Sequence, residues 1–210
     1  ISQMEAASGK KPLVKYWIHT GFLNFKGEKM SKSLGNFLTV RNALKDYNYK
    51  TIRFAFISNH YKSPMDFSKE ILNQSKNSLD RLNDLALNSK NKIRKMKESE
   101  IKKYKEQFHK ELDDDFNTPK AFSVLFDFVR TANKIKAGDE AFQFLKEVDE
   151  ICNILTLEQN IPKEIIKLAE ERKAARKDNN WKESDKLRDK ILKKGYIIED
   201  EDNSYKIKNV

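Results

Sequence analysis

Residues 118–132 read TPKAFSVLFDFVRTA, and this stretch decides the fold class. Thr118 suits a helix N-cap and Pro119 the first helical position, where no backbone donor is needed. The apolar residues that follow share one helical face: Phe122, Leu125, Phe126, Val129 and Ala132. The next stretch repeats the pattern with Phe142, Leu145, Val148, Cys152 and Leu155. Such stripes are typical of helices packed in a bundle, and we expect Cys152 to belong to that core.

The pattern stays helical in the part of the chain before this stretch. Apolar or small side chains recur at helical spacing: Ile71, Leu72, Ser75, Leu79, Leu82 and Ala86. Residues 90–110 hold nine Lys or Arg against three Glu, which is typical of a solvated helix or a mobile connection. Nearer the N-terminus, residues 13–25 are rich in β-branched and aromatic side chains and favour short strands. Two short helices are expected next, one that Thr39 caps and Asn48 closes, and one over residues 51–60.

A boundary is expected at Pro162, followed by a small module. Its first helix is charged and carries Ile165, Leu168, Ala169 and Arg172. Asn180 suits the N-cap of a second helix, which Gly195 ends. Two short strands, Tyr196–Glu199 and Ser204–Lys208, are expected on either side of the acidic turn DEDN.

The composition excludes several protein classes. Six Gly and four Pro among 210 residues argue against a β-sandwich or a collagen-like chain. A single cysteine excludes an intrachain disulfide, and three scattered histidines leave no zinc cluster. No apolar run reaches the roughly 18–20 residues of a membrane span. The 42 Lys or Arg against 32 Asp or Glu give a net charge of +10, which favours a nucleic acid partner, although lysines that merely solvate the surface would give the same balance.

The sharpest motif is GEKMSKSLGN at residues 27–36. Its lysines, serines and glycine-flanked backbone offer ammonium, hydroxyl and N–H donors to a triphosphate. A bare pair of lysines three apart is a weak signal, but the string KMSKSLGN resembles the second signature of class I aminoacyl-tRNA synthetases. The preceding YWIHTGFL, residues 16–23, is similar to the segment that leads into this loop in the cysteinyl and methionyl members.

Three later segments narrow the resemblance to the cysteinyl-tRNA synthetases. They are HYKSPMDFS at 60–68, LDDDFNTPKA at 112–121 and RKAARKDNNW at 172–181. The similarity runs from residue 1 to about 208, in order and with matching spacing. It implies a mainly α fold in three parts. These are the edge of a Rossmann-type catalytic domain with the signature loop (1–58), a helical bundle (59–162) and a small α/β anticodon-binding module (163–210).

The resemblance also implies an activity. Members of the family use ATP, with Mg²⁺, to convert cysteine to cysteinyl-adenylate and then transfer it to the 3′ end of tRNA(Cys). It assigns ATP binding to the signature residues, with Lys32 and Lys29 as the catalytic pair: Lys29, Met30, Ser31, Lys32 and Ser33. Cations placed where negative charge develops toward pyrophosphate lower the barrier of such a step.

The family's other active-site elements are not found in this sequence. The His-Ile-Gly-His type signature is absent, and the last zinc ligand of the family would fall just before Ile1. We therefore expect a zinc ion in an N-terminal half, no metal site in this chain, and no ligase activity from this chain alone. The protein is expected to be cytoplasmic and monomeric, with cysteine, ATP and tRNA(Cys) as partners and no membrane contact.

The resemblance places the anticodon contacts on five residues: Arg176, Trp181, Asp185, Arg188 and Asp200. Trp181, Asp185 and Arg188 lie at i, i+4 and i+7, so they share a helical face that can stack on and read unpaired bases. From the pattern alone, a core position for Trp181 in line with Leu192 is slightly favoured. The acidic triplet at residues 113–115 fits a Mg²⁺ site, but favourable interaction with the dipole of the helix at Thr118 is the preferred explanation.

Three alternatives stay open. A stand-alone tRNA-binding module would have no ligase activity. A related ligase joins cysteine to an amino sugar but lacks the anticodon module, so residues 171–208 argue against it. A methionyl enzyme fits the loop but not the later segments.

Overall fold

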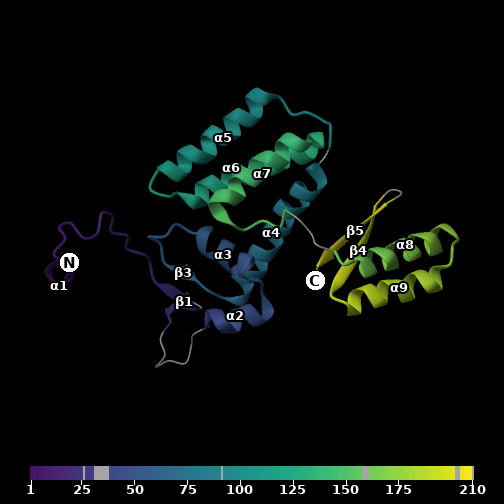
Figure 1. Cartoon of the computed structure of the whole chain (residues 1–210), viewed down its shortest axis with the longest axis horizontal. Coiled ribbons are helices and arrows are strands. Elements are labelled where there is room, and N and C mark those ends of the chain that lie inside the picture. Colours follow the sequence, from purple (N-terminus) through teal and green to yellow (C-terminus); the bar gives the residue numbers. More distant parts are fainter. Residues whose placement is uncertain (26, 31–37, 91, 158–160, 202–203, 210) are drawn as a thin grey trace. The chain divides into compact units, whose positions relative to one another are not determined.

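The computed structural model describes residues 1–210 except 26, 31–37, 91, 158–160, 202–203 and 210. The chain divides into two compact units, Ile1–Leu157 and Glu158–Val210. Helices are the main elements of both, which confirms the mainly α fold class (Figure 1). The finer division into three domains at residues 58 and 162 stays a prediction.

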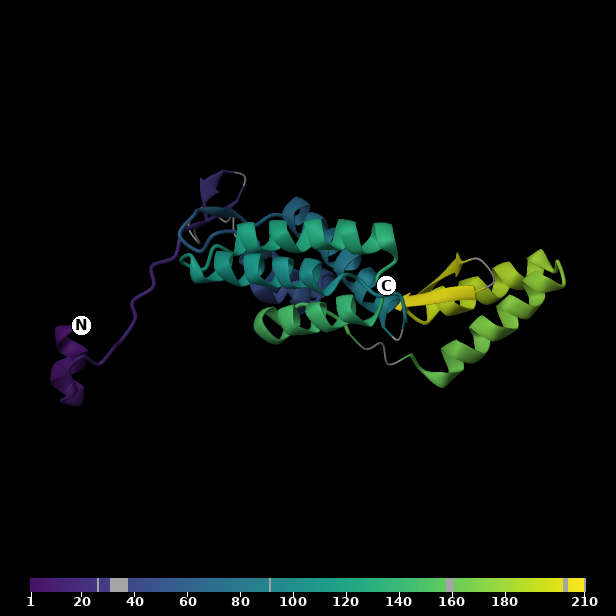
Figure 2. The same cartoon turned by 90° about the horizontal axis from the view of Figure 1, so that it is seen from above.

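The first unit is built around a helical bundle. Its helices are α1 Ser2–Ser8, α2 Val40–Asp46, α3 Tyr49–Ile57, α4 Lys69–Ser89, α5 Glu98–Asp113, α6 Thr118–Ile135 and α7 Asp139–Cys152. The last four pack against one another (Figure 2). Every residue of the predicted apolar stripe on α6 is buried or partly buried in one core. The rings of Phe128 and Phe144 meet edge to face there, with centroids 4.8 Å apart.

Cys152 lies in this core, as predicted. Its side chain is buried, and that burial raises the pKa of the thiol to about 11. The thiol therefore stays neutral near pH 7, and the residue serves packing rather than nucleophilic chemistry.

A small sheet brings together residues about forty positions apart. β1 Leu23–Phe25 pairs antiparallel with β2 Glu28–Lys29 and parallel with β3 Met65–Asp66. The expectation of strands over residues 13–25 is thus right only for the last three. The expected loop from Gly27 is also wrong at its start, because residues 28–29 find a strand partner in β1.

Local capping residues set most helix starts. Thr39 caps α2 as predicted, since its Oγ1 accepts the Asn42 N–H at 3.0 Å. Asn48 begins α3, because its Oδ1 accepts the Thr51 N–H at 2.9 Å, so α3 starts at Tyr49 rather than Thr51.

The N-cap predicted for α6 is wrong by one residue. Asn117 is the cap, and its Oδ1 accepts the Lys120 N–H at 3.4 Å. Thr118 is already helical, and its hydroxyl instead donates to the Asn59 carbonyl oxygen at 3.3 Å. The threonine is therefore used to join two segments rather than to cap.

The second unit is a helical hairpin followed by a strand hairpin. Its elements are α8 Lys163–Lys177, α9 Trp181–Lys193, β4 Tyr196–Glu201 and β5 Ser204–Asn209. They share a small apolar core: Ile165, Ala169, Ile191, Ile198 and Ile207. Asn180 caps α9 as predicted, and Gly195 follows the helix with φ of 85°.

The acidic turn expected after residue 199 is wrong in its first half. Asp200 and Glu201 continue β4 and pair with Tyr205 and Ser204 of β5. The strand tolerates the charge of Asp200 because two arginine side chains neutralise it.

Candidate functional site

The signature motif begins on a hairpin that the rest of the first unit holds in place. Met30 donates its N–H to the Leu23 carbonyl oxygen at 3.1 Å, and its side chain packs, partly buried, on the cluster around Phe67. The Gly27 N–H donates to Asp66 Oδ1 at 3.1 Å. Met30 thus anchors the end of the hairpin by packing.

The other proposed ATP-binding residues are only partly placed. Lys29 pairs through its backbone with Asn24 of β1. Ser31, Lys32 and Ser33 lie outside the residues that the structure describes. The assignment of Lys29 and Lys32 to catalysis therefore stays a prediction.

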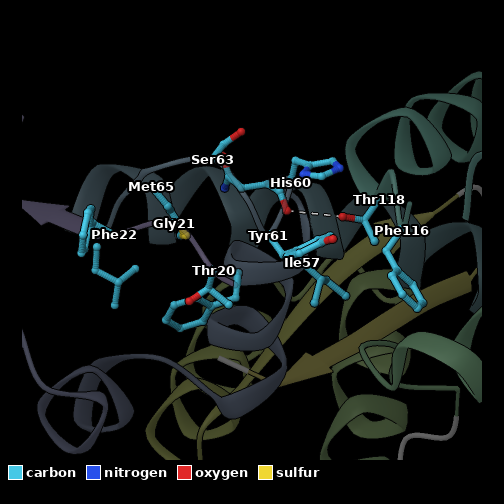
Figure 3. Close-up of a pocket in the computed structure, with 13 residues that line it drawn as sticks. Thr20, Gly21, Phe22, Ile57, His60, Tyr61, Ser63, Met65, Phe116 and Thr118 are labelled. Carbon is cyan, nitrogen blue, oxygen red and sulfur yellow. Dashed lines mark hydrogen bonds between the residues drawn. The ribbon is translucent and has the colours of Figure 1, made fainter. Parts of the chain in front are cut away.

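A cavity of about 400 Å³ lies beside this hairpin (Figure 3). Its walls are mostly apolar and come from β1, the end of α3, the segment 59–65 and the start of α6. Gly21 closes one side, where its N–H donates to the Tyr61 carbonyl oxygen at 2.7 Å. A Cβ at Gly21 would lie 2.2 Å from the Ser63 carbonyl oxygen, so this close approach requires glycine.

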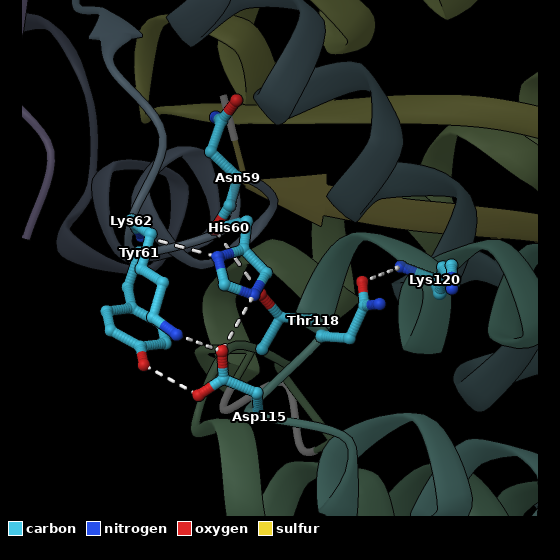
Figure 4. A network of polar contacts seen from close by, with 8 residues as sticks. Asn59, His60, Tyr61, Lys62, Asp115, Thr118 and Lys120 are labelled. Atoms are coloured by element: carbon cyan, nitrogen blue, oxygen red, sulfur yellow. Dashed lines mark hydrogen bonds and ion pairs between the residues drawn. The ribbon is translucent and has the colours of Figure 1, made fainter.

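Asp115 of the acidic triplet holds the segment beside this cavity (Figure 4). The Tyr61 hydroxyl donates to its Oδ1 at 2.7 Å, the Lys62 ammonium donates to its Oδ2, and His60 Nε2 lies 3.9 Å from Oδ2. Hydrogen bonds from Lys62 and then Tyr61 hold the pKa of the Asp115 carboxyl below its ordinary value.

The explanation of the triplet by the dipole of α6 is therefore wrong. Asp113 is the last residue of α5, and the first turn of α6 carries no acidic residue. Asp115 has a structural role, as expected, but through side-chain pairing. Both of its oxygens have protein partners, which leaves it a poor Mg²⁺ ligand.

In the second unit, Asp200 is held by two arginines. Arg172, only 2% exposed, donates from Nη1 to Oδ1 at 2.6 Å and from Nη2 to Oδ2 at 3.0 Å. Arg176 Nη1 lies 3.3 Å from Oδ2. The Arg172 hydrogen bonds lower the pKa of the Asp200 carboxyl more than partial burial raises it, and the charges of Arg176 and Arg188 act in the same direction.

The remaining anticodon candidates adjoin this pair. The Arg176 guanidinium lies over the Trp181 ring, 5.3 Å from its centroid. Arg188 Nη2 lies 3.3 Å from Asp185 Oδ1, one turn along α9. The structure therefore brings Arg176, Trp181 and Asp200 into direct contact. The Arg188–Asp185 pair lies close enough for the Arg188 charge to act on Asp200.

Trp181 lies at the protein surface rather than in the core. Its side chain is 54% exposed and that of Leu192 is 51% exposed, so the alternative of a shared core position is wrong. An exposed indole beside arginines can stack on unpaired bases, and the carboxylates can accept hydrogen bonds from base amino groups.

Sequence reasoning missed the part played by Arg172. We expected it on the charged α8 among apolar neighbours, without a function. Its spacing of four from Arg176 was the available signal, since residues i and i+4 lie on one helical face.

The described ranges contain neither a metal-binding cluster of side chains nor a helix that could span a membrane. No group of three His, Cys, Asp or Glu side chains there could hold a metal ion. No helix among the same residues is long and apolar enough to cross a membrane.

Three family models match consecutive parts of the chain. They are the tRNA synthetases class I (C) catalytic domain at residues 1–77, the DALR domain at 107–159 and the cysteinyl-tRNA ligase anticodon binding domain at 158–205. A curated relative, the cysteine–tRNA ligase of Lachnospira eligens, is 38% identical over 95% of this chain. The chain covers 46% of that relative, about half its length.

A solved structure is similar at greater distance. It is the crystal structure of the ternary complex of Agrobacterium radiobacter K84 agnB2 LeuRS-tRNA-LeuAMS. The match covers 59% of this chain and 18% of that one, with 16% identity and a TM-score of 0.48.

Proposed function

The chain belongs to the cysteine–tRNA ligase family and corresponds to its C-terminal portion, and from this premise we propose that its protein joins cysteine to tRNA(Cys). In this reaction the carboxylate of cysteine attacks the α-phosphate of ATP. Cysteinyl-adenylate forms, and pyrophosphate is the leaving group. A hydroxyl of the terminal ribose of the tRNA then attacks the aminoacyl carbonyl carbon, and AMP leaves.

The signature hairpin is proposed to act in the first step. Lys32 and Lys29 donate to the triphosphate, and Ser31 and Ser33 add hydroxyl donors. As negative charge moves toward the leaving pyrophosphate, fixed cations stabilise the transition state more than the bound substrate. The described open end of the hairpin supports this role: Met30 donates its N–H to the Leu23 carbonyl oxygen and packs on the cluster around Phe67, which fixes where the loop begins.

The second unit is proposed to bind the anticodon. The observation that carries this proposal is the contact of Arg176 with both Trp181 and Asp200, with the Arg188–Asp185 pair on the same module, inside the segment that matches an anticodon-binding family. Residues 171–195 carry ten Lys or Arg against five Asp or Glu, which suits the phosphates that flank the bases.

The partners proposed for the whole protein are those of the family. They are cysteine, ATP with Mg²⁺ and tRNA(Cys), and the protein is proposed to act as a cytoplasmic monomer. A zinc ion would bind through residues outside this chain, where a thiolate-preferring metal can select cysteine over serine.

The test is an aminoacylation assay. It uses a polypeptide that contains this chain and has the full length of the matching relative, called here the family-length protein. Purified protein is mixed with ATP, radiolabelled cysteine and tRNA(Cys), and acid-precipitable label is counted. Methionine and an amino-sugar acceptor serve as parallel substrates. Cysteine-dependent charging of tRNA(Cys) supports the proposal. Three results would contradict it: charging of tRNA with methionine but not with cysteine, transfer of cysteine only to the amino sugar, or no transfer of cysteine at all.

A further inference from the structure

Arg172 is a charged side chain on the buried side of helix α8. It is 2% exposed and is the largest fully buried side chain among the residues that the structure describes. It shares the buried side of this helix with Ile165 and Ala169, which belong to the small apolar core of the second unit. Its Nε has no hydrogen-bond partner among the described atoms. A buried, incompletely paired guanidinium contributes little to folding stability, because an apolar side chain of similar volume often stabilises a core as much or more.

The contacts of Arg172 run from the core to the surface. Its two terminal nitrogens bond the two oxygens of Asp200, and this forked pairing favours one orientation of the carboxylate. Asp200 Oδ2 also faces Arg176, whose guanidinium lies over the Trp181 ring. Arg172 is therefore the fixed end of a chain of contacts whose other end is an exposed aromatic face.

We propose that Arg172 is a positioning residue for RNA recognition: it clamps Asp200 so that Arg176 and Trp181 are preorganised to receive an unpaired base. The inference rests on the proposed anticodon-binding function. Arg172 itself is too deeply buried to touch RNA, so its effect passes through Asp200. Preorganisation matters because side chains that must be ordered on binding reduce affinity.

The decisive variants are Arg172→Met and Arg172→Lys. Methionine has a similar length and removes the charge. Asp200 is not left as an unpaired buried carboxylate in this variant, because it still faces Arg176 and its side chain is 40% exposed to solvent. Lysine keeps the charge but cannot bond both oxygens in a fork. Arg130→Met is the matched control, because Arg130 pairs with Asp127 on the exposed face of α6.

Each variant is made in the full 210-residue chain, and thermal unfolding shows whether it folds. Its affinity is then measured at fixed salt for tRNA(Cys) and for transcripts with one altered anticodon base, and the ratio of the two affinities is the preference for the cognate anticodon. We expect Arg172→Met and Arg172→Lys to fold, and to lose about tenfold or more of the preference for the cognate anticodon, the scale of one bidentate contact. Arg130→Met should keep that preference. Wild-type preference in a folded Arg172→Met chain, or failure of both Arg172 variants to fold, would overturn the positioning role.

A second readout needs no RNA. The chain has two tryptophans, so Trp17→Phe leaves Trp181 as the only indole. Acrylamide quenching of Trp181 fluorescence should rise in Arg172→Met, because Arg176 no longer covers the ring stably. Unchanged quenching would count against the positioning role. If the wild-type chain showed no preference for the cognate anticodon, the proposed function would fail, and the quenching result would still decide the role of Arg172.

Discussion

Replacing Trp181 by alanine should weaken RNA binding while leaving the fold intact. The indole is 54% exposed, and Arg176 covers only one face of its ring. Stacking of one base on an aromatic side chain contributes about 1–3 kcal/mol, which is roughly 5- to 150-fold in Kd. Loss of the exposed cation–π contact removes only about 0.5–1 kcal/mol of folding free energy.

The assay compares three proteins against an anticodon stem-loop by fluorescence anisotropy. Trp181→Phe is the matched control, since it keeps an aromatic face at the first residue of α9. We expect wild-type and Trp181→Phe affinities to differ little, and Trp181→Ala to bind about tenfold or more weakly. In the family-length protein, cysteine-dependent ATP–pyrophosphate exchange should stay unchanged, because that step needs no RNA. Undiminished RNA binding by Trp181→Ala would refute the stacking role, and lost exchange would indicate a folding role instead.

Three further changes probe the other sites. Lys32→Ala in the family-length protein should reduce cysteine-dependent ATP–pyrophosphate exchange by about a hundredfold or more, the scale of one preorganised charge contact, and near-normal exchange would contradict its role. Gly21→Ala should lower the melting temperature, because the new Cβ would lie 2.2 Å from the Ser63 carbonyl oxygen; an unchanged melting temperature would show that the close approach is dispensable. Because folding lowers the pKa of Asp200, its stabilisation should be present above the unfolded pKa of about 3.9 and be lost as the pH falls through the folded pKa. Urea unfolding from pH 6 to pH 2 should then show a steeper loss for wild type than for Asp200→Asn, and parallel curves would be inconsistent with the pairing.

Features encoded by neighbouring residues could be predicted from the sequence. The α6 and α7 stripes and the caps at Thr39 and Asn180 depend on side chains at most a few positions apart. The five anticodon candidates came from the resemblance, and the local spacing on α9 placed three of them on one face. For residues 90–110 the sequence analysis left a solvated helix and a mobile connection open, and the structure forms helix α5 over Glu98–Asp113.

Features that depend on distant partners could not be predicted. Asp115 is held by Tyr61 and Lys62, more than fifty positions earlier, so its neighbours alone suggested a dipole interaction. Asp200 continues a strand because Arg172, 28 positions earlier, neutralises it. Strand β1 likewise exists only where β2 and β3 supply hydrogen-bond partners. In each case a long-range contact overrides the local preference.

The most direct test of the account is a ribose-cleavage footprint of tRNA(Cys) bound to this chain. We expect the bound chain to protect the anticodon loop at saturating protein, and Trp181→Ala to abolish that protection. An anticodon loop that is cleaved as fast with the wild-type chain bound as without it would contradict the account.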